Sequence, residues 1–114
     1  MKSLAEMKFV PIQGDESRIS KEEMGELKSM IPKWEIVKLD GEDRLQRVFE
    51  FDNFAQALGF TNQVGSLAEE QDHHPRLVTE WGRVTATWWT HKIGGLHQND
   101  FIMASKTEQL YEAE

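Results

Sequence analysis

The chain contains no cysteine, and this absence narrows the chemistry that it can carry. Disulfide bridges, thiolate metal sites and a cysteine nucleophile are all excluded. No apolar run reaches the length of a membrane span, and the N-terminal residues lack the hydrophobic segment of a signal peptide. We therefore expect a cytoplasmic protein without a membrane partner.

Clusters of basic residues are also missing. The formal net charge is −7, and no run of Lys and Arg offers a surface for a phosphate backbone. We therefore expect no nucleic-acid partner.

The length allows one compact domain. A chain of 114 residues is too short for two domains, and four Trp and six Phe supply a modest core. Residues 1–19 show no clean period and are interrupted by Pro11 and Gly14. We expect an N-terminal arm over residues 1–19 and a single domain over residues 20–114.

The first half of this domain predicts a helix followed by a hairpin. Ser20 and Glu23 have the spacing of a capping box, and Pro32 ends the helix that they begin. Residues 34–39 alternate as a strand, and residues 40–43 form a turn cluster. In the next strand the residues expected on one face are Leu45, Phe49 and Phe51, with Arg47 as an exception to the alternation.

A long helix is expected next, with Asp52 as its N-cap and an end near Gln71. Its predicted apolar stripe contains Phe54, Ala57, Leu58, Thr61, Val64, Gly65 and Ala68, widened by Phe60 and Leu67.

Residues 76–90 predict a second hairpin. Gly82 and Arg83 suit a two-residue turn with Gly first, which would place Val78 opposite Thr87 and His74 opposite His91. In the later strand one face is expected to point to the core (Val84, Ala86, Trp88, Thr90) and the other to form a more polar surface (Thr85, Thr87, Trp89, His91). Trp89 would be an interface anchor, a flat wall for a planar ligand, or simply a partly exposed strand residue.

A last helix is expected from His97 or Gln98 to Tyr111. The fold class is therefore α+β, with an antiparallel four-stranded sheet, helices packed on one face, and the order α-β-β-α-β-β-α. An exposed edge strand in so small a sheet favours pairing between subunits, so we expect a homodimer or homotetramer.

Three of the four histidines lie where the long helix gives way to the second hairpin, at His73, His74 and His91. Imidazoles give and take protons near neutral pH, so this group favours acid–base catalysis. Glu69 and Asp72 are close enough in sequence to orient them. A zinc or iron site is a second interpretation, although His-His-Pro does not have the spacing of a helical metal motif. Surface or capping histidines are a third.

The spacing of these residues resembles the signature of the pterin-4a-carbinolamine dehydratases. The run from Glu69 to Pro75 reads E-x-x-x-H-H-P, and five further residues lead to Trp81. Thr90-His91 and the segment from Gly95 to Asp100, G-L-x-x-x-D, complete the pattern. An upstream F-x-F-x-x-F-x-x-A, beginning at Phe49, is also similar, and the likeness covers roughly residues 20–105.

This resemblance implies an α+β fold and the dehydration of 4a-hydroxytetrahydropterin to quinonoid dihydropterin, which recycles the cofactor of aromatic amino-acid hydroxylases. It implies no metal and no cofactor, because the pterin is the substrate. His73, His74 and His91 would surround the pterin, with His73 and His91 on the hydroxyl side and His74 as binder or base. The residues expected to bind or orient the substrate are Glu69, Asp72, Trp89, Thr90, Lys92 and Asp100.

Two departures from the family pattern bear on the site. His97 stands where a Thr or Ser commonly caps the last helix, so Asp100 is expected to divide between capping and a site role. Trp88-Trp89 is bulkier than the residues usual there. An alternative within the same resemblance is a non-catalytic pterin-binding or dimerisation protein, since animal members also act as dimerisation cofactors of a transcription factor. A link to molybdopterin metabolism is a further alternative.

Overall fold

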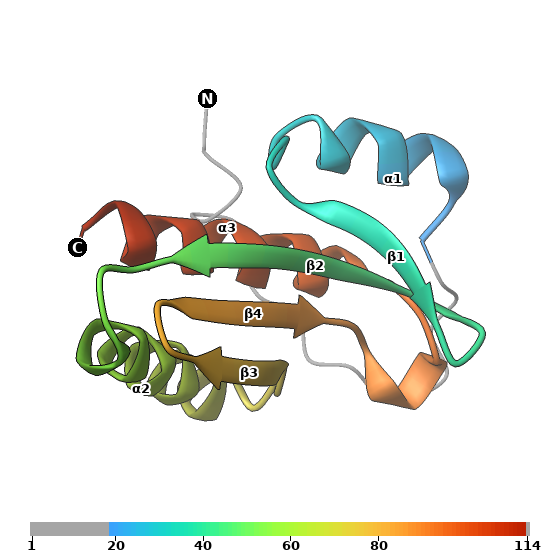
Figure 1. Ribbon diagram of the computed structural model, residues 1–114. Coiled ribbons are helices and arrows are strands. Elements are labelled where there is room, and N and C mark those ends of the chain that lie inside the picture. The colour runs from blue at the N-terminus through green and yellow to red at the C-terminus, as the bar shows by residue number, and fades with distance from the viewer. Residues whose placement is uncertain (1–18, 114) are drawn as a thin grey trace.

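Four antiparallel strands form the centre of the structure, a computed structural model that describes residues 19–113. The sheet order is β1-β2-β4-β3, with β1 (Glu35–Leu39), β2 (Glu42–Glu50), β3 (Arg76–Glu80) and β4 (Arg83–Trp88) (Figure 1). The helices are α1 (Lys21–Lys28), α2 (Phe54–Gln71) and α3 (Gln98–Glu112), with a 3₁₀ turn η2 (His91–Ile93) after β4. The predicted α+β class and element order are confirmed. Of the arm predicted over residues 1–19, residues 1–18 lie outside the described residues.

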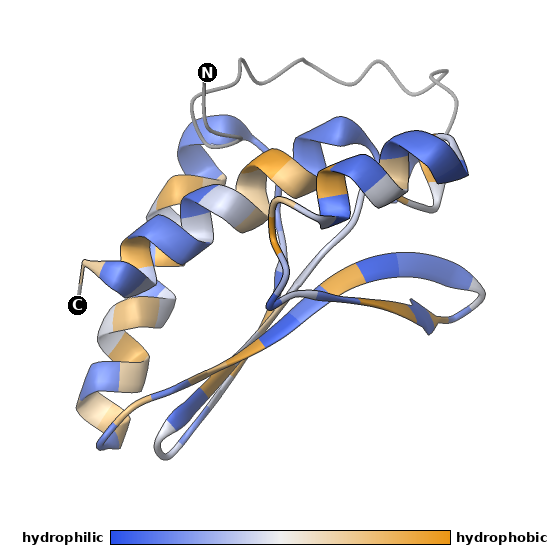
Figure 2. Ribbon diagram, turned by 90° about the horizontal axis from the view of Figure 1, so that it is seen from above, coloured by the Kyte–Doolittle hydropathy of each residue, from blue (hydrophilic) through white to orange (hydrophobic). Residues whose placement is uncertain are grey.

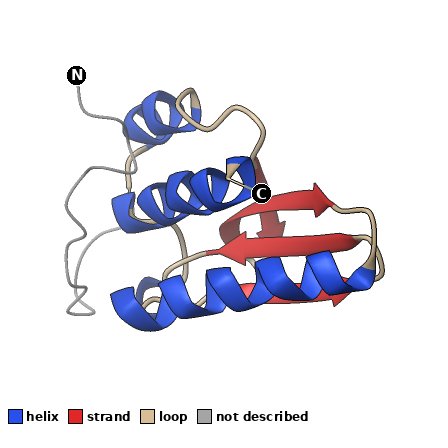
Figure 3. Ribbon diagram, turned by 90° about the vertical axis from the view of Figure 1, so that its left-hand side faces the viewer, coloured by secondary structure: helices blue, strands red, loops and turns tan. Residues whose placement is uncertain are grey.

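All of these α-helices lie on one side of the sheet. Seen from above, the opposite side of the described sheet carries no helix (Figure 2). Helix α2 packs over β3 and β4, α3 packs over β2 and β4, and α1 packs on α3 (Figure 3). Ile19, at the end of the expected arm, packs against the core and its N–H donates to the carbonyl of Leu96 at 3.1 Å.

Helix α1 begins as the sequence predicts. The N–H of Glu23 donates to the hydroxyl of Ser20, the N-cap residue, at 3.2 Å. The hairpin that follows turns through Asp40 and Gly41, whose φ angles are 53° and 77°. Two successive positive φ angles are typical of the type I′ turn, which matches the twist of antiparallel strands. Glu42 and Asp43, expected in the turn, already belong to β2.

Arg47, the exception in the alternation of β2, has a partner on the helix side of the sheet. Its guanidinium pairs with the carboxylate of Glu108, which also accepts from Trp34 Nε1 at 2.9 Å. The guanidinium lies 4.4 Å from the ring centre of Phe49. Burial lowers the pKa of Arg47 below its ordinary value, but arginine stays charged in proteins. The charge of Arg47 is tolerated at this position because the carboxylate of Glu108 pairs with it.

The predicted end of α2 at Gln71 is confirmed, but its predicted N-cap is wrong. Asn53 caps the helix, because its side-chain oxygen accepts from the N–H of Gln56 at 2.9 Å. The buried positions are Ala57, Phe60, Val64 and Ala68. Phe54 and Leu58 are each 44% exposed, so the buried face is rotated towards Phe60 and away from part of the predicted stripe.

The predicted turn of the second hairpin is also wrong by one position. The loop is Trp81-Gly82 rather than Gly82-Arg83, so Val78 faces Thr85 instead of Thr87. Gly82 supplies its positive φ of 76° at the second loop position, whereas the prediction used it at the first. This register also removes the predicted opposition of His74 and His91. The partners shift by two residues, so every side chain keeps its expected face.

The two faces of β4 and the two residues that follow it differ less in burial than expected. Val84, Ala86, Trp88 and Thr90 are buried, as predicted for the core face. Thr87 and Trp89, on the face expected to be polar and open, are 0% and 8% exposed. None of the described helices is long and apolar enough to cross a membrane.

Candidate active site

The buried part of the site is built around Asp100, in the first turn of α3. Its Oδ1 lies 2.6 Å from His73 Nε2, and its Oδ2 accepts from the Thr90 hydroxyl at 2.8 Å. Oδ2 also accepts from the N–H of His97 at 2.9 Å. Because Asp100 is 0% exposed, these three donors replace the water that a carboxylate would otherwise bind. A single carboxylate thus ties the α2–β3 connection to the end of β4.

His97 completes the capping box of α3. Its Nδ1 accepts from the N–H of Asn99 at 3.0 Å, while the Asp100 carboxylate binds the N–H of His97. The substitution of His for Thr or Ser therefore preserves a cap. Asp100 was expected to divide between capping α3 and a role in the site. Its two oxygens allow both, because Oδ2 accepts from the His97 N–H of the cap and Oδ1 contacts His73.

His73 and His74 point to different environments. Asp72 ends α2 in the left-handed region, at φ 50° and ψ 44°, and the chain leaves the helix there. Extended neighbours point to opposite sides. His73 is accordingly 7% exposed, with its ring stacked on Trp88 at 5.8 Å between centres and 5° between planes. The side chain of His74 is 53% exposed.

The exposed part of the site contains His74, His91 and Glu69. His74 Nε2 lies 2.6 Å from Glu69 Oε1, from the last turn of α2. His91 Nε2 lies 3.3 Å from the main-chain carbonyl of His74. A carbonyl can only accept, so His91 carries its proton on Nε2 and, when neutral, offers Nδ1 as the acceptor. The histidines therefore do approach each other, but through a main-chain oxygen rather than across a strand ladder.

The remaining predicted residues lie around this group. Thr90 is buried, and its N–H donates to the carbonyl of Gly95 at 2.9 Å. Lys92 is exposed on η2, and Asp72 is exposed at the end of α2. Trp89 is 8% exposed, and the guanidinium of Arg44 lies 3.9 Å from the centre of its ring. The sequence prediction missed Arg44, since two strands separated by a long helix give no local signal of their pairing.

Within residues 19–113 no three His, Asp or Glu side chains are grouped so that they could hold a metal ion.

Comparison with known proteins identifies the family of this chain. The family model described as pterin 4 alpha carbinolamine dehydratase matches residues 17–110. The chain belongs to this dehydratase family. A protein from Nitrosococcus oceani is 54% identical over 110 residues, covering 96% of this chain and 97% of that protein. One from Chlorobium limicola is 54% identical over 112 residues, covering 98% and 99%. Both are named, provisionally, as pterin-4-alpha-carbinolamine dehydratases.

Solved structures support the same family fold. A Brucella melitensis protein described as a transcriptional coactivator/pterin dehydratase is 34% identical, with a TM-score of 0.75 over 83% of this chain and 99% of that one. A pterin dehydratase-like RuBisCO assembly factor of the alpha-carboxysome is 20% identical, with a TM-score of 0.59 over 69% of this chain and 89% of that one. At that identity the second likeness shows the fold alone. Members of the dehydratase fold thus carry descriptions that differ in function.

Proposed function

We propose that the protein dehydrates a 4a-hydroxytetrahydropterin to quinonoid dihydropterin and water, and so recycles the pterin cofactor of an aromatic amino-acid hydroxylase. The observation that carries this proposal is the pair of exposed imidazoles, His74 and His91, beside a buried His73–Asp100 pair. The His91 ring contacts the main-chain carbonyl of His74, which brings the two residues together. The reaction breaks a carbon–oxygen bond, protonates the departing hydroxyl and removes a proton from a ring nitrogen. Two positioned imidazoles can supply both proton transfers.

We assign a different role to each of the three histidines from its exposure and its contacts. His74 is open and its Nε2 is held by Glu69, so we assign it the proton transfer at the ring nitrogen. A carboxylate partner orients an imidazole and stabilises its protonated form. His91 is assigned to the departing hydroxyl. His73 is almost enclosed, so we assign it to shaping the site rather than to the hydroxyl side as first expected.

The exposed polar residues around the histidines would bind the pterin. Glu69, Asp72 and Lys92 present donors and acceptors to a polar heterocycle at this surface. Thr90 and Asp100 are buried and would act by orienting His73. No metal or organic cofactor takes part in the reaction as proposed.

The direct test is the dehydration of freshly generated 4a-hydroxytetrahydropterin, followed by ultraviolet absorbance. We expect the folded protein to accelerate the reaction well above the spontaneous rate, and heat-denatured protein to have no effect. No acceleration by protein with a native circular dichroism spectrum would contradict the dehydratase proposal and favour a non-catalytic role.

We also propose that the protein is a homodimer joined at β3, an edge of the sheet. The two-residue loop makes Glu80 and Arg83 a hydrogen-bonded pair, and the bonds alternate along the ladder. The main-chain groups of Leu77 and Thr79 therefore point away from β4, to the free edge. An antiparallel pair of β3 strands with its two-fold axis at Val78 would use these groups and place Arg76 opposite Glu80 of the partner subunit.

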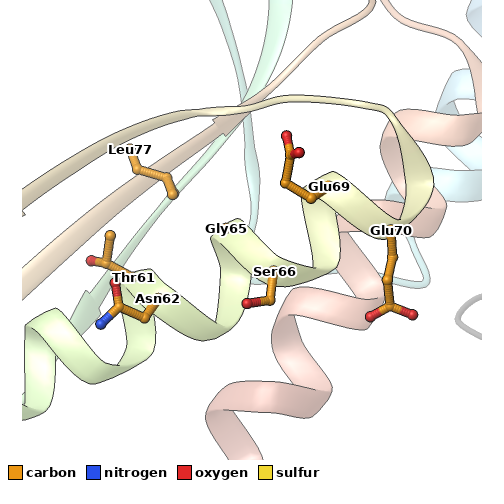
Figure 4. A pocket seen from close by; sticks show the side chains of 7 residues that line it. All are labelled: Thr61, Asn62, Gly65, Ser66, Glu69, Glu70 and Leu77. Carbon is orange, nitrogen blue, oxygen red and sulfur yellow. The ribbon is translucent and has the colours of Figure 1, made fainter.

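An open groove of about 850 Å³ lies beside this edge. Leu77 on β3 and small residues on α2, including Gly65 and Ser66, line it, and Glu69 lies at its end nearest His74 (Figure 4). Small side chains allow a second helix to approach closely, so the α2 helix of the partner subunit is the proposed occupant. The same register would bring Trp81 of the partner subunit, which is 74% exposed, next to Pro75.

Charge reversal tests this register. In Arg76→Glu the new carboxylate would lie opposite the carboxylate of Glu80 at each end of the strand pair. We expect the dissociation constant of the dimer to rise about tenfold. The double variant R76E/E80R restores opposite charges and should restore the affinity. Sedimentation velocity over a range of concentrations measures both. A monomeric wild type, or a double variant as weak as the single one, would rule out this interface.

A further inference from the structure

Three side chains lie in a row on the helix-free side of the sheet. The guanidinium carbon of Arg44, on β2, lies 3.9 Å from the ring centre of Trp89. The ring of Trp89 in turn lies 4.4 Å from the ring of His91, with 35° between their planes. Arg44 and Trp89 are each 8% exposed, whereas His91 is exposed. The row thus runs from a covered cation to an open imidazole of the proposed site.

The first hairpin holds Arg44 in place. Its Nη2 lies 2.8 Å from Glu42 Oε1 and 3.6 Å from Asp40 Oδ2. The Asp40 side chain is 90% exposed, so water screens that pair and Glu42 is the main partner. The Nε of Arg44 is buried without a hydrogen-bond partner in the described structure. Leaving a buried donor unpaired is costly, so hydrogen bonding alone does not explain this position. Besides its pair with Glu42, the guanidinium stacks on Trp89.

His91 needs such a support. Its Nε2 is held by the carbonyl of His74 at 3.3 Å, which is long for a hydrogen bond between nitrogen and oxygen. An exposed ring held at one atom can still turn about that bond. The face of Trp89 restricts this turn, and the guanidinium on Trp89 restricts the indole.

We propose that Arg44 is a positioning residue for the active site, acting through Trp89 to fix the plane of the His91 ring. A cation stacked on an indole is a favourable and geometrically specific contact, and a planar guanidinium covers the ring better than an ammonium. In this proposal Arg44 acts through Trp89 and His91, and not by a contact of its own with the substrate. The structural part of this proposal is independent of the reaction, and its kinetic consequence rests on the proposed dehydratase function.

The test compares Arg44→Met with Arg44→Lys. Methionine keeps an apolar chain over the indole but removes the plane and the charge, and lysine restores the charge alone. The matched control is Arg83→Met, because Arg83 lies on β4, pairs with Glu80 and has a side chain that is 54% exposed.

The first measurement is the proton resonance of the His91 ring, assigned by comparison with His91→Gln. A ring stacked on an indole is shifted upfield, so we expect Arg44→Met to move this resonance towards the position of a free histidine. Arg44→Lys should give an intermediate position and Arg83→Met no change. The second measurement is dehydration kinetics. We expect kcat to fall about tenfold in Arg44→Met with a much smaller change in KM, because misplacing a catalytic group affects the transition state more than binding.

Each outcome has a clear meaning. An unmoved His91 resonance in folded Arg44→Met overturns the proposal, as does an equal shift in Arg83→Met. An inactive wild type whose His91 resonance still responds to Arg44→Met would refute the proposed function and leave the positioning role standing. If Arg44→Met fails to fold, Arg44→Lys decides, since wild-type resonance and kcat in that variant would show that the planar stack is not required.

Discussion

His74→Ala is expected to lower kcat for dehydration by about 10²–10⁴, which is the usual contribution of a positioned general acid or base. The imidazole removed is exposed, and its Nε2 lies 2.6 Å from the Glu69 carboxylate. Because its side chain is 53% exposed, the free energy of unfolding should change by less than about 0.5 kcal/mol. Steady-state kinetics and urea unfolding measure the two effects separately.

Neighbouring carboxylates provide the matched control for this experiment. Glu69→Gln keeps the shape of the side chain but removes the carboxylate that orients the His74 ring, and we expect about a tenfold loss in kcat. Glu70→Gln changes the adjacent residue, also exposed on α2, and should have no effect. If His74→Ala keeps more than about a third of the wild-type kcat, proton transfer by His74 is not part of the mechanism.

Patterns confined to a few residues predicted the fold well. The N-cap at Ser20 and the turn at Asp40 and Gly41 each depend on chemistry within a short segment, and both are observed. The alternation of β4 correctly placed Val84, Ala86 and Trp88 in the core. These patterns predict well because the structure of each segment is determined by residues within that same segment.

The errors arose where distant parts of the chain decide the outcome. Gly82 fits either position of a two-residue turn, so composition alone did not fix the register of the second hairpin. The rotation of α2 that buries Phe60 and exposes Phe54 depends on where the sheet and α3 lie. Trp89 was expected to be an interface anchor, a wall for a planar ligand or a partly exposed strand residue. It is 8% exposed, and one of the groups that contact its ring is Arg44, on a different hairpin.

The candidate site was predictable as a group of residues but not as a geometry. The motif predicted that His73, His74 and His91 share one site, and adjacent side chains on an extended chain point to opposite sides. Their burial follows that expectation, with His73 enclosed and His74 open. No local pattern shows that one carboxylate, Asp100, joins His73 to Thr90, because these three residues come from three separate segments.

Asp100→Ala is therefore expected to be the most destabilising change in the site. It leaves His73, Thr90 and the N–H of His97 without their shared acceptor in a fully buried position. Removing one partner of a buried polar or charged pair costs about 3–5 kcal/mol, and we expect a loss of unfolding free energy in that range. Asp100→Asn keeps the shape and one acceptor oxygen, so we expect a loss of about 2 kcal/mol and a folded protein.

The folded Asp100→Asn variant separates the two roles of this carboxylate when it is compared with His97→Ala. The latter removes the other half of the capping box, whose Nδ1 accepts from the N–H of Asn99, without touching the contact to His73. A lost helix cap costs about 1 kcal/mol. If Asp100 also orients His73, Asp100→Asn should lower kcat by about 10–100-fold, the range found when a group that orients a site ligand is lost. His97→Ala should then lower stability and leave kcat within about twofold. Equal effects of the two variants on both stability and kcat would mean that Asp100 acts as a helix cap alone, because a cap is the one contact that they have in common.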